Sequence, residues 1–193
     1  MTDPIDAHQV LMTGENSFIR LSHDGGTTMS DRTSHWRVLW CPVGSGHALF
    51  MQGELTGGAV RIYGDNIAVV RWLQRTIETL LHAPFADEGV SVVPAEFSRE
   101  GDPRSATTET VESDDDIVRL TWYDGLEPFI LNAPPGTAGR PLGVLSTFFP
   151  HRSAQLSLND RVATGATWLE RRGEHQSASA VLAWSESWLK PRD

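Results

Sequence analysis

Cysteine is almost absent from this sequence of 193 residues, since Cys41 is the only one. A single cysteine excludes a disulfide within the chain and any metal knuckle built from several thiolates. The first residues carry acids where a secretory signal would carry Lys or Arg, and no continuous apolar run follows them. We therefore expect a protein of the reducing cytoplasm.

Basic clusters and long apolar runs are also lacking. The longest basic run is the pair Arg171 and Arg172, and the formal net charge is −9, from 16 Lys and Arg against 25 Asp and Glu. Nucleic acids and anionic membrane surfaces attract basic patches, so we expect neither as a partner. No segment reaches the apolar length that a membrane helix needs.

The sequence is rich in material for a core. Hydrophobic residues make up 39% of the chain and include seven tryptophans. Large aromatic side chains bury much apolar surface, and the length suits one folded unit. We therefore treat residues 1–193 as a single domain.

Alternation of apolar and polar residues predicts strands along much of the chain. Residues 35–42 place Trp36, Val38 and Trp40 on one side, and residues 117–123 and 178–189 alternate in the same way. Short turns rich in Gly, Asn and Asp separate these runs, which is typical of an antiparallel meander. The fold class predicted is mainly β: a barrel or a strongly curved sheet.

One amphipathic helix is predicted at about residues 65–82, packed on this sheet. Asp65 or Asn66 can cap its N-terminus, and Pro84 ends it. Glu78 falls on the predicted polar side, with Arg71 and Arg75. The predicted apolar stripe has helical spacing and consists of Ile67, Val70, Leu73, Ile77, Leu80 and Leu81.

Three segments are predicted to lie outside the core. Residues 1–16 read as a loose N-terminal arm, and residues 22–34 have the Gly, Ser, Thr and Asp content of a loop. Residues 99–116 hold seven acids and two arginines with few apolar residues. Such a composition buries little, so we expect an acidic flexible loop there.

Glu186 is the carboxylate with the most suggestive surroundings. In the last predicted strand it shares one side with Trp184 and Trp188, its neighbours at i−2 and i+2. In an apolar cavity its pKa would be raised, which suits general acid or base chemistry. The alternative is a glutamate at the rim of the sheet, paired with an arginine.

Two further clusters lie at the ends of predicted strands, where sites on β scaffolds often lie. One holds Tyr123 and Asp124 with Glu127, and the other holds Tyr63 with Asp65. A Tyr and Asp pair can bind a carbonyl group and transfer a proton. The alternative for each aspartate is structural, because Asp124 precedes a turn glycine and Asp65 can cap the helix.

The histidines show no metal-binding pattern. His23, His35 and His47 are twelve residues apart, a spacing that could align them on adjacent strands. No H-x-H or H-E-x-x-H motif accompanies them. We predict neither a metal nor another cofactor.

Residues 148–165, FFPHRSAQLSLNDRVATG, join a short strand, a proline, an alternating strand, an Asn turn and a glycine. This order resembles lipocalin-like (calycin) domains, in particular the carotenoid hydratase and AttH-like group. The N-terminal G-x-W signature of lipocalins is not recognisable, and the helix falls between strands instead of after the last one. The resemblance implies the barrel architecture and no catalytic residue.

The leading functional hypothesis is the binding of a hydrophobic small molecule in an aromatic-lined cavity of the barrel. The predicted lining residues are Trp36, Trp40, Trp122, Trp184, Trp188 and Phe148. The second hypothesis is a cofactor-independent hydratase, isomerase or cyclase. Its predicted acid–base groups are Glu186, Tyr123, Asp124 and Tyr63. The third is a structural or interaction domain. The oligomeric state is left open.

Overall fold

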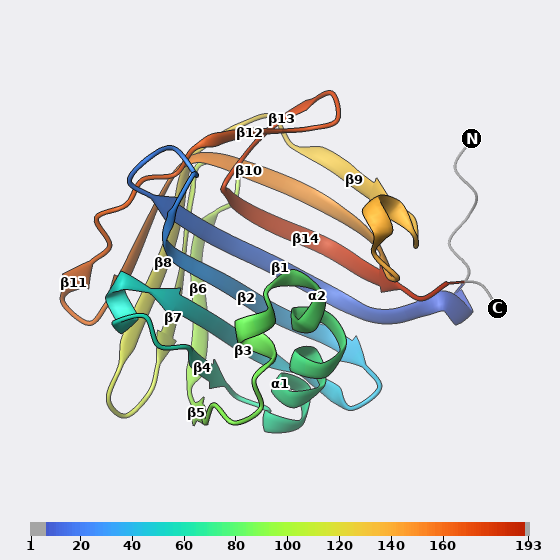
Figure 1. The fold of residues 1–193 in the computed structure, drawn as a ribbon, viewed down its shortest axis with the longest axis horizontal. Coiled ribbons are helices and arrows are strands. Elements are labelled where there is room, and N and C mark those ends of the chain that lie inside the picture. The colour runs from blue at the N-terminus through green and yellow to red at the C-terminus, as the bar shows by residue number, and fades with distance from the viewer. Residues whose placement is uncertain (1–6, 192–193) are drawn as a thin grey trace.

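A computed structural model describes residues 7–191 and consists mainly of strands. Ten strands follow one another in a curled half-barrel sheet, which confirms the predicted fold class. Their order is β5-β4-β3-β2-β1-β14-β10-β8-β7-β6 (Figure 1). The first half of the chain contributes β1 (Val10–Ser22), β2 (Met29–Cys41), β3 (Gly44–Gly53), β4 (Arg61–Gly64), β5 (Val92–Pro94) and β6 (Glu96–Asp102).

The second half of the chain completes the sheet. It contributes β7 (Ala106–Glu112), β8 (Ile117–Gly125), β9 (Phe129–Ala133), β10 (Gly143–Leu158), β11 (Arg161–Val162) and β14 (Ala180–Leu189). The 16-residue strand β10 pairs with β14 on one edge and with β8, β9 and β11 elsewhere along its length. β12 (Leu169–Arg172) and β13 (His175–Ala178) form a separate two-stranded ladder.

The predicted helix is present as one continuous helical segment that contains a π-helical turn. It consists of α1 (Ile67–Leu73), a π-helical turn at Gln74–Glu78 and α2 (Thr79–Leu81). Asn66 caps its N-terminus through its side chain. Ile67, expected in the buried stripe, is exposed, and Glu78, expected on the polar side, is buried. None of the helices in residues 7–191 is long and apolar enough to span a membrane.

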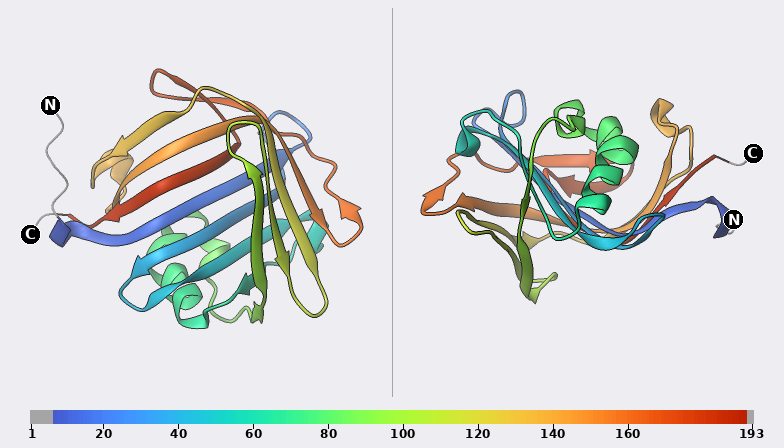
Figure 2. Two further views of the ribbon diagram at one scale, coloured as in Figure 1. Left: turned by 180° about the vertical axis from the view of Figure 1, so that it is seen from behind. Right: turned by 90° about the horizontal axis from the view of Figure 1, so that it is seen from below.

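Apolar residues pack on both faces of the sheet. On one, the helix face, the helical segment covers a cluster built around Trp36, Phe50 and Trp188. The sheet curls over the other face, so that side chains of β7 and β8 pack with those of β1 and β3. The views of Figure 2 show the helical segment and the β6–β7 hairpin on opposite sides. The second cluster, including Ile19, Leu49, Trp122 and Leu182, fills the inside of this curl.

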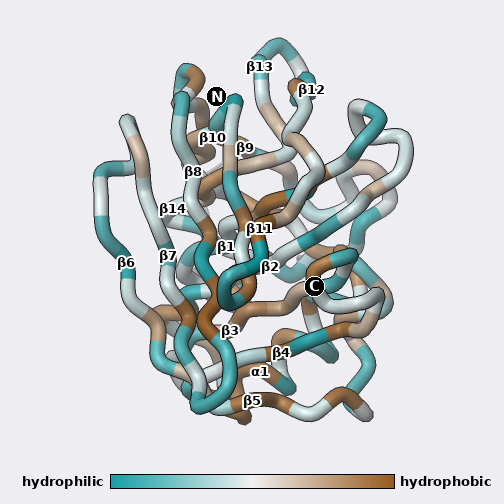
Figure 3. Tube along the Cα trace, turned by 90° about the vertical axis from the view of Figure 1, so that its left-hand side faces the viewer, coloured by the Kyte–Doolittle hydropathy of each residue, from teal (hydrophilic) through white to brown (hydrophobic). Residues whose placement is uncertain are grey.

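Three predicted segments differ from the structure. The loop at residues 22–34 is wrong for residues 29–34, which belong to β2. The loose arm at residues 1–16 is wrong for residues 10–16, which belong to the central strand β1; residues 1–6 lie outside the described part. The acidic loop at residues 99–116 is also wrong, because most of it forms β6 and β7, paired with β8. Most of the hairpin is coloured hydrophilic or neutral in Figure 3, although Glu109 and Val111 in β7 are buried.

Candidate functional site

A pocket of about 170 Å³ lies between the helical segment and the face of the sheet that it covers. We call it the helix-face pocket. Residues of β1, β2 and β14 line one side, residues 78–85 line another, and residues of β9, β10 and β12 complete it. Its lining combines aromatic side chains, two carboxyl groups and four arginines.

Glu78 is fully buried at the end of the π-helical turn. Its Oε1 accepts hydrogen bonds from Ser34 Oγ and Trp36 Nε1, each at 2.6 Å, and its Oε2 has no partner among the described residues. Burial raises the pKa of Glu78 to about 7, although the two hydrogen bonds oppose this effect. The carboxyl is therefore partly protonated near neutral pH, and one of its buried oxygens is unsatisfied in the described chain.

Glu186 reaches the same pocket through a β-bulge in β14. Ser185 has a φ of 49°, and the pairs Leu145↔Ser187 and Thr147↔Trp184 leave two residues of β14 opposite one residue of β10. A bulge of this kind changes the face on which the following side chains lie. Glu186 therefore lies on the helix face with Trp188, and not beside Trp184 as predicted.

The Glu186 side chain is only 3% exposed. Its Oε1 accepts a hydrogen bond from Trp188 Nε1 at 2.6 Å. Burial raises the pKa of Glu186 to about 8, and the hydrogen bonds from Trp188 and Ser146 oppose this rise. The alternative of a rim glutamate paired with an arginine is wrong, because no ion pair involves Glu186 among residues 7–191.

Arg32 brings positive charge to the pocket. Its Nη1 lies 2.6 Å from His82 Nδ1, and His82 Nε2 lies 2.9 Å from Gln52 Oε1. Burial, with the nearby Arg32 charge, lowers the pKa of His82 to about 4, so the imidazole is neutral and accepts from Arg32. In the described part of the chain, Arg32 has no ion pair with a carboxylate.

The helix-face pocket brings together three of the residues predicted from the sequence: Glu186, Trp188 and Phe148. Trp36 lies beside it, bonded to Glu78 and with its ring centroid 6.2 Å from that of Trp188. These residues come from β2, β10 and β14, so alternation placed them on strands without showing which strands are neighbours.

The other predicted aromatic residues lie elsewhere. Trp122 and Trp184 pack on the opposite face, where Trp184 contacts Phe149. Trp40, expected to point inward, is 50% exposed. The five tryptophans therefore do not line one common cavity.

The predicted tyrosine and aspartate groups do not converge on the helix-face pocket. Tyr63 is buried on the opposite face and donates to Asp116 Oδ2 at 2.8 Å, and burial raises its pKa to about 12. Tyr123 is 43% exposed, and Asp124, with a φ of 59°, lies 3.5 Å from Arg152. Asp124 is a residue of β8, paired in the ladder with β10, so the turn role given as its structural alternative is wrong.

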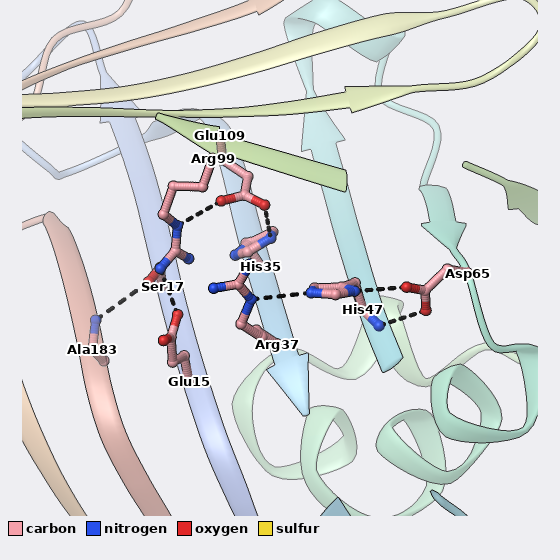
Figure 4. Close-up of polar contacts among 9 residues, drawn as sticks. All are labelled: Glu15, Ser17, His35, Arg37, His47, Asp65, Arg99, Glu109 and Ala183. Atoms are coloured by element: carbon pink, nitrogen blue, oxygen red, sulfur yellow. Dashed lines mark hydrogen bonds and ion pairs between the residues drawn. The ribbon is translucent and has the colours of Figure 1, made fainter. Parts of the chain in front are cut away.

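A second polar cluster lies inside the curl, where the hairpin β6–β7 meets β1 and β2 (Figure 4). Arg99 Nε donates to Glu109 Oε2 and Arg99 Nη1 donates to Glu15 Oε2, both at 2.7 Å, and His35 Nε2 is 3.2 Å from Glu109 Oε1. Burial would raise the pKa of Glu109, but His35 and Arg99 outweigh it and lower the pKa to about 2. The charges compensate one another, so the cluster holds the hairpin in place.

The three evenly spaced histidines do not form a site. His35 and His47 lie on the adjacent strands β2 and β3 and both contact the ring of Phe97. Each histidine has a different carboxylate partner: His23 pairs with Glu54, His35 with Glu109 and His47 with Asp65. Within residues 7–191 no group of His, Cys, Asp and Glu has an arrangement that could hold a metal ion.

Sequence reasoning missed Glu78, Ser34 and Arg32. The helical pattern placed Glu78 on the polar side because it did not include the π-helical turn. Ser34 and Arg32 lie two and four residues before Trp36, on the same side of the strand. They fall in residues 22–34, whose composition suggested a loop. Continuing the alternation of residues 35–42 backwards could have found both.

No family model matches the chain, and no curated protein or solved structure matches it significantly. The resemblance to lipocalin-like domains therefore stays a prediction.

Proposed function

We propose that this protein binds a small, mainly apolar molecule in the helix-face pocket. The supporting observation is the unpartnered Oε2 of Glu78, a fully buried oxygen of a residue that lines the pocket. Buried polar atoms in folded proteins nearly always have a partner, so an unsatisfied one on a residue that lines a cavity favours a ligand. Trp188 and Phe148 supply the apolar surface.

The volume limits the size of the ligand. At about 170 Å³ the pocket is similar to the engineered cavity of roughly 150 Å³ that binds benzene. A single ring, or a chain of similar volume, would fill it. A protonated Glu78 or Glu186 would donate a hydrogen bond to a carbonyl or hydroxyl oxygen of such a ligand.

A second candidate is the cofactor-independent hydratase, isomerase or cyclase. It is favoured by the pKa values of about 7 for Glu78 and about 8 for Glu186, because both carboxyls exchange protons near neutral pH in one pocket. Tyr63, Tyr123 and Asp124 lie away from this pocket and have no part in the proposal.

Binding is tested by titrating the protein calorimetrically with small neutral probes: phenol, benzyl alcohol and indole. We expect at least one of these probes to bind. The Leu131→Trp change should weaken its binding tenfold or more, because the larger side chain fills the pocket. Ile130→Trp is the matched control, because Ile130 immediately precedes Leu131 on β9 but is 68% exposed. No binding to the wild-type protein, or equal loss in both variants, would contradict the proposal.

Carrier and enzyme are separated by Glu186→Gln, which keeps a hydrogen-bonding group but cannot exchange a proton. An enzyme using this acid would lose turnover of a bound probe while keeping its affinity within a few-fold. A carrier would show no turnover of any bound probe in either form.

A further inference from the structure

Three arginines gather at one end of the helix-face pocket. Arg20 comes from β1, Arg172 from β12, and Arg140 from the loop that precedes β10. Together with Arg32 they are four of the 16 basic residues in a chain whose net charge is −9. A quarter of the basic residues of the chain therefore line this one pocket.

These arginines are poorly compensated. Glu170 is the only carboxylate that forms an ion pair with Arg20 or Arg172, at 2.7 and 3.7 Å, and Arg140 has no ion pair in residues 7–191. Burial lowers the pKa of Arg172, the charge of Glu170 opposes this effect, and the like charges of Arg20 and Arg140 add to it. Arg20 and Arg172 thus share one carboxylate and Arg140 has none in the described chain, and an anion bound among the three would relieve their repulsion.

Some hydrogen-bond donors of these arginines also lack an acceptor. The Nε atoms of Arg20 and Arg172 are buried and have no hydrogen-bond partner in the described chain. The guanidinium of Arg172 lies 5.4 Å from the ring centroid of Phe148, and that of Arg20 lies 5.1 Å from the ring of Phe18. Aromatic rings under the guanidinium groups hold them in place and continue the apolar surface into the pocket.

We propose that Arg20, Arg140 and Arg172 form an anion subsite, and that the ligand is a small acid whose apolar part occupies the helix-face pocket. The inference rests on the proposed function and specifies the chemical class of its ligand. The anionic group is a carboxylate or a phosphate monoester, both of which match the geometry of a guanidinium. The apolar part is about one ring in size and lies between Phe148 and Trp188.

A small anion fits these observations better than a polyanion. The subsite belongs to a pocket of about 170 Å³, and acidic residues outnumber basic ones by nine in the chain as a whole. A nucleic acid or an anionic membrane would meet that repulsion over a wide surface, whereas one anionic group meets only the local positive charge.

The test compares charged and neutral probes of one size by calorimetry: benzoate, phenyl phosphate, benzyl alcohol and inorganic phosphate. We expect benzoate or phenyl phosphate to bind at least tenfold more tightly than benzyl alcohol, and this preference to shrink between 20 and 500 mM NaCl. Whichever of the two binds more tightly identifies the anionic group. If phosphate alone binds as tightly as phenyl phosphate, the pocket contributes nothing and the inference is wrong.

Charge-removing variants locate the subsite. We expect Arg140→Gln and Arg172→Gln each to weaken the binding of the preferred anion about tenfold, which is the effect of one charge-assisted hydrogen bond. The affinity for benzyl alcohol should stay unchanged. Arg140→Gln removes no ion pair, so it should not affect folding. Arg171→Gln is the matched control, because Arg171 is adjacent on β12 and its side chain donates to the carbonyl of Glu174, with no ion pair in residues 7–191.

The outcomes separate the two proposals. Binding of benzyl alcohol without preference for the anions overturns the anion subsite and leaves the proposed function standing. Absence of binding by all probes overturns both. Equal weakening in the Arg171 and Arg172 variants shows a general charge effect and also overturns the subsite.

Discussion

The backbone of Ser185 has a left-handed φ of 49°, a conformation that costs a side-chain-bearing residue about 1–2 kcal/mol. Its position in the β14 bulge places Glu186 on the helix face and leaves Trp184 on the other. The bulge therefore decides whether Glu186, the single carboxyl side chain of β14, faces the pocket or the inside of the curl.

Replacing Ser185 by glycine tests this conformation. Glycine adopts a positive φ freely, so Ser185→Gly should leave the free energy of unfolding unchanged or raise it by up to about 1 kcal/mol. Ser187→Gly, two residues further along the same strand, should lower it by about 0.5–1 kcal/mol. Urea denaturation measures both, and equal destabilisation by the two changes would show that Ser185 is not in the left-handed region.

At the residue scale, the sequence identified part of the candidate site. Alternation singled out Glu186, Trp188 and Phe148, because a large aromatic or a carboxyl stands out in a strand pattern. It also grouped Trp184 with Glu186, because a strict period of two cannot show a bulge. Glu78 was hidden for a similar reason, since one π-helical turn moves it from the polar side of the helix to the buried side.

At the element scale, the hairpin of β6 and β7 shows how composition misleads. Its acids suggested a flexible loop, but Thr107, Glu109 and Val111 alternate with half-buried or exposed residues along β7. The buried charge of Glu109 is compensated by His35 and Arg99, which lie 74 and 10 residues away in sequence. Arg99 is the cross-strand partner of Glu109 within the hairpin. His35 lies so far away along the chain that it leaves no local signal.

The hairpin should depend on this ion cluster. Arg99→Leu would leave Glu15 without its partner and Glu109 with His35 alone, and breaking a buried ion pair costs about 3–5 kcal/mol. We expect a loss of that size in the free energy of unfolding by urea. Arg104→Leu, in the exposed turn of the same hairpin, is the control and should change stability by less than about 0.5 kcal/mol. A small effect of Arg99→Leu would mean that the hairpin packs without the cluster.

At the scale of the whole molecule, the strand content, the curvature and the single helical segment were predictable, since each rests on a local pattern repeated along the chain. The order of strands was not, because β1 pairs with β14 from the other end of the sequence. That pairing brings Asn16 and Glu186 to one pocket. The pocket therefore depends on long-range pairing that alternation cannot indicate.

The two buried carboxyls predict how stability changes with pH. Their pKa values in the folded protein are about 7 for Glu78 and about 8 for Glu186, against 4.5 as the ordinary value. Above pH 4.5 the unfolded chain loses these protons first, so the folded state binds more protons. Their contribution to stability is complete below pH 4.5 and is lost as pH rises through 7 and 8. Each carboxyl accounts for about 3 kcal/mol or more.

We therefore expect the free energy of unfolding to fall between pH 5 and pH 8.5, as measured by urea denaturation at a series of pH values. The double variant Glu78→Gln with Glu186→Gln carries no proton to lose at these positions, so its stability should vary much less over this range. Glu127→Gln, at an exposed position, should reproduce the wild-type slope. If the double variant keeps the full wild-type slope, the two carboxyls are ionised in the folded protein, and the hydrogen-bond donation proposed for them in the pocket is wrong.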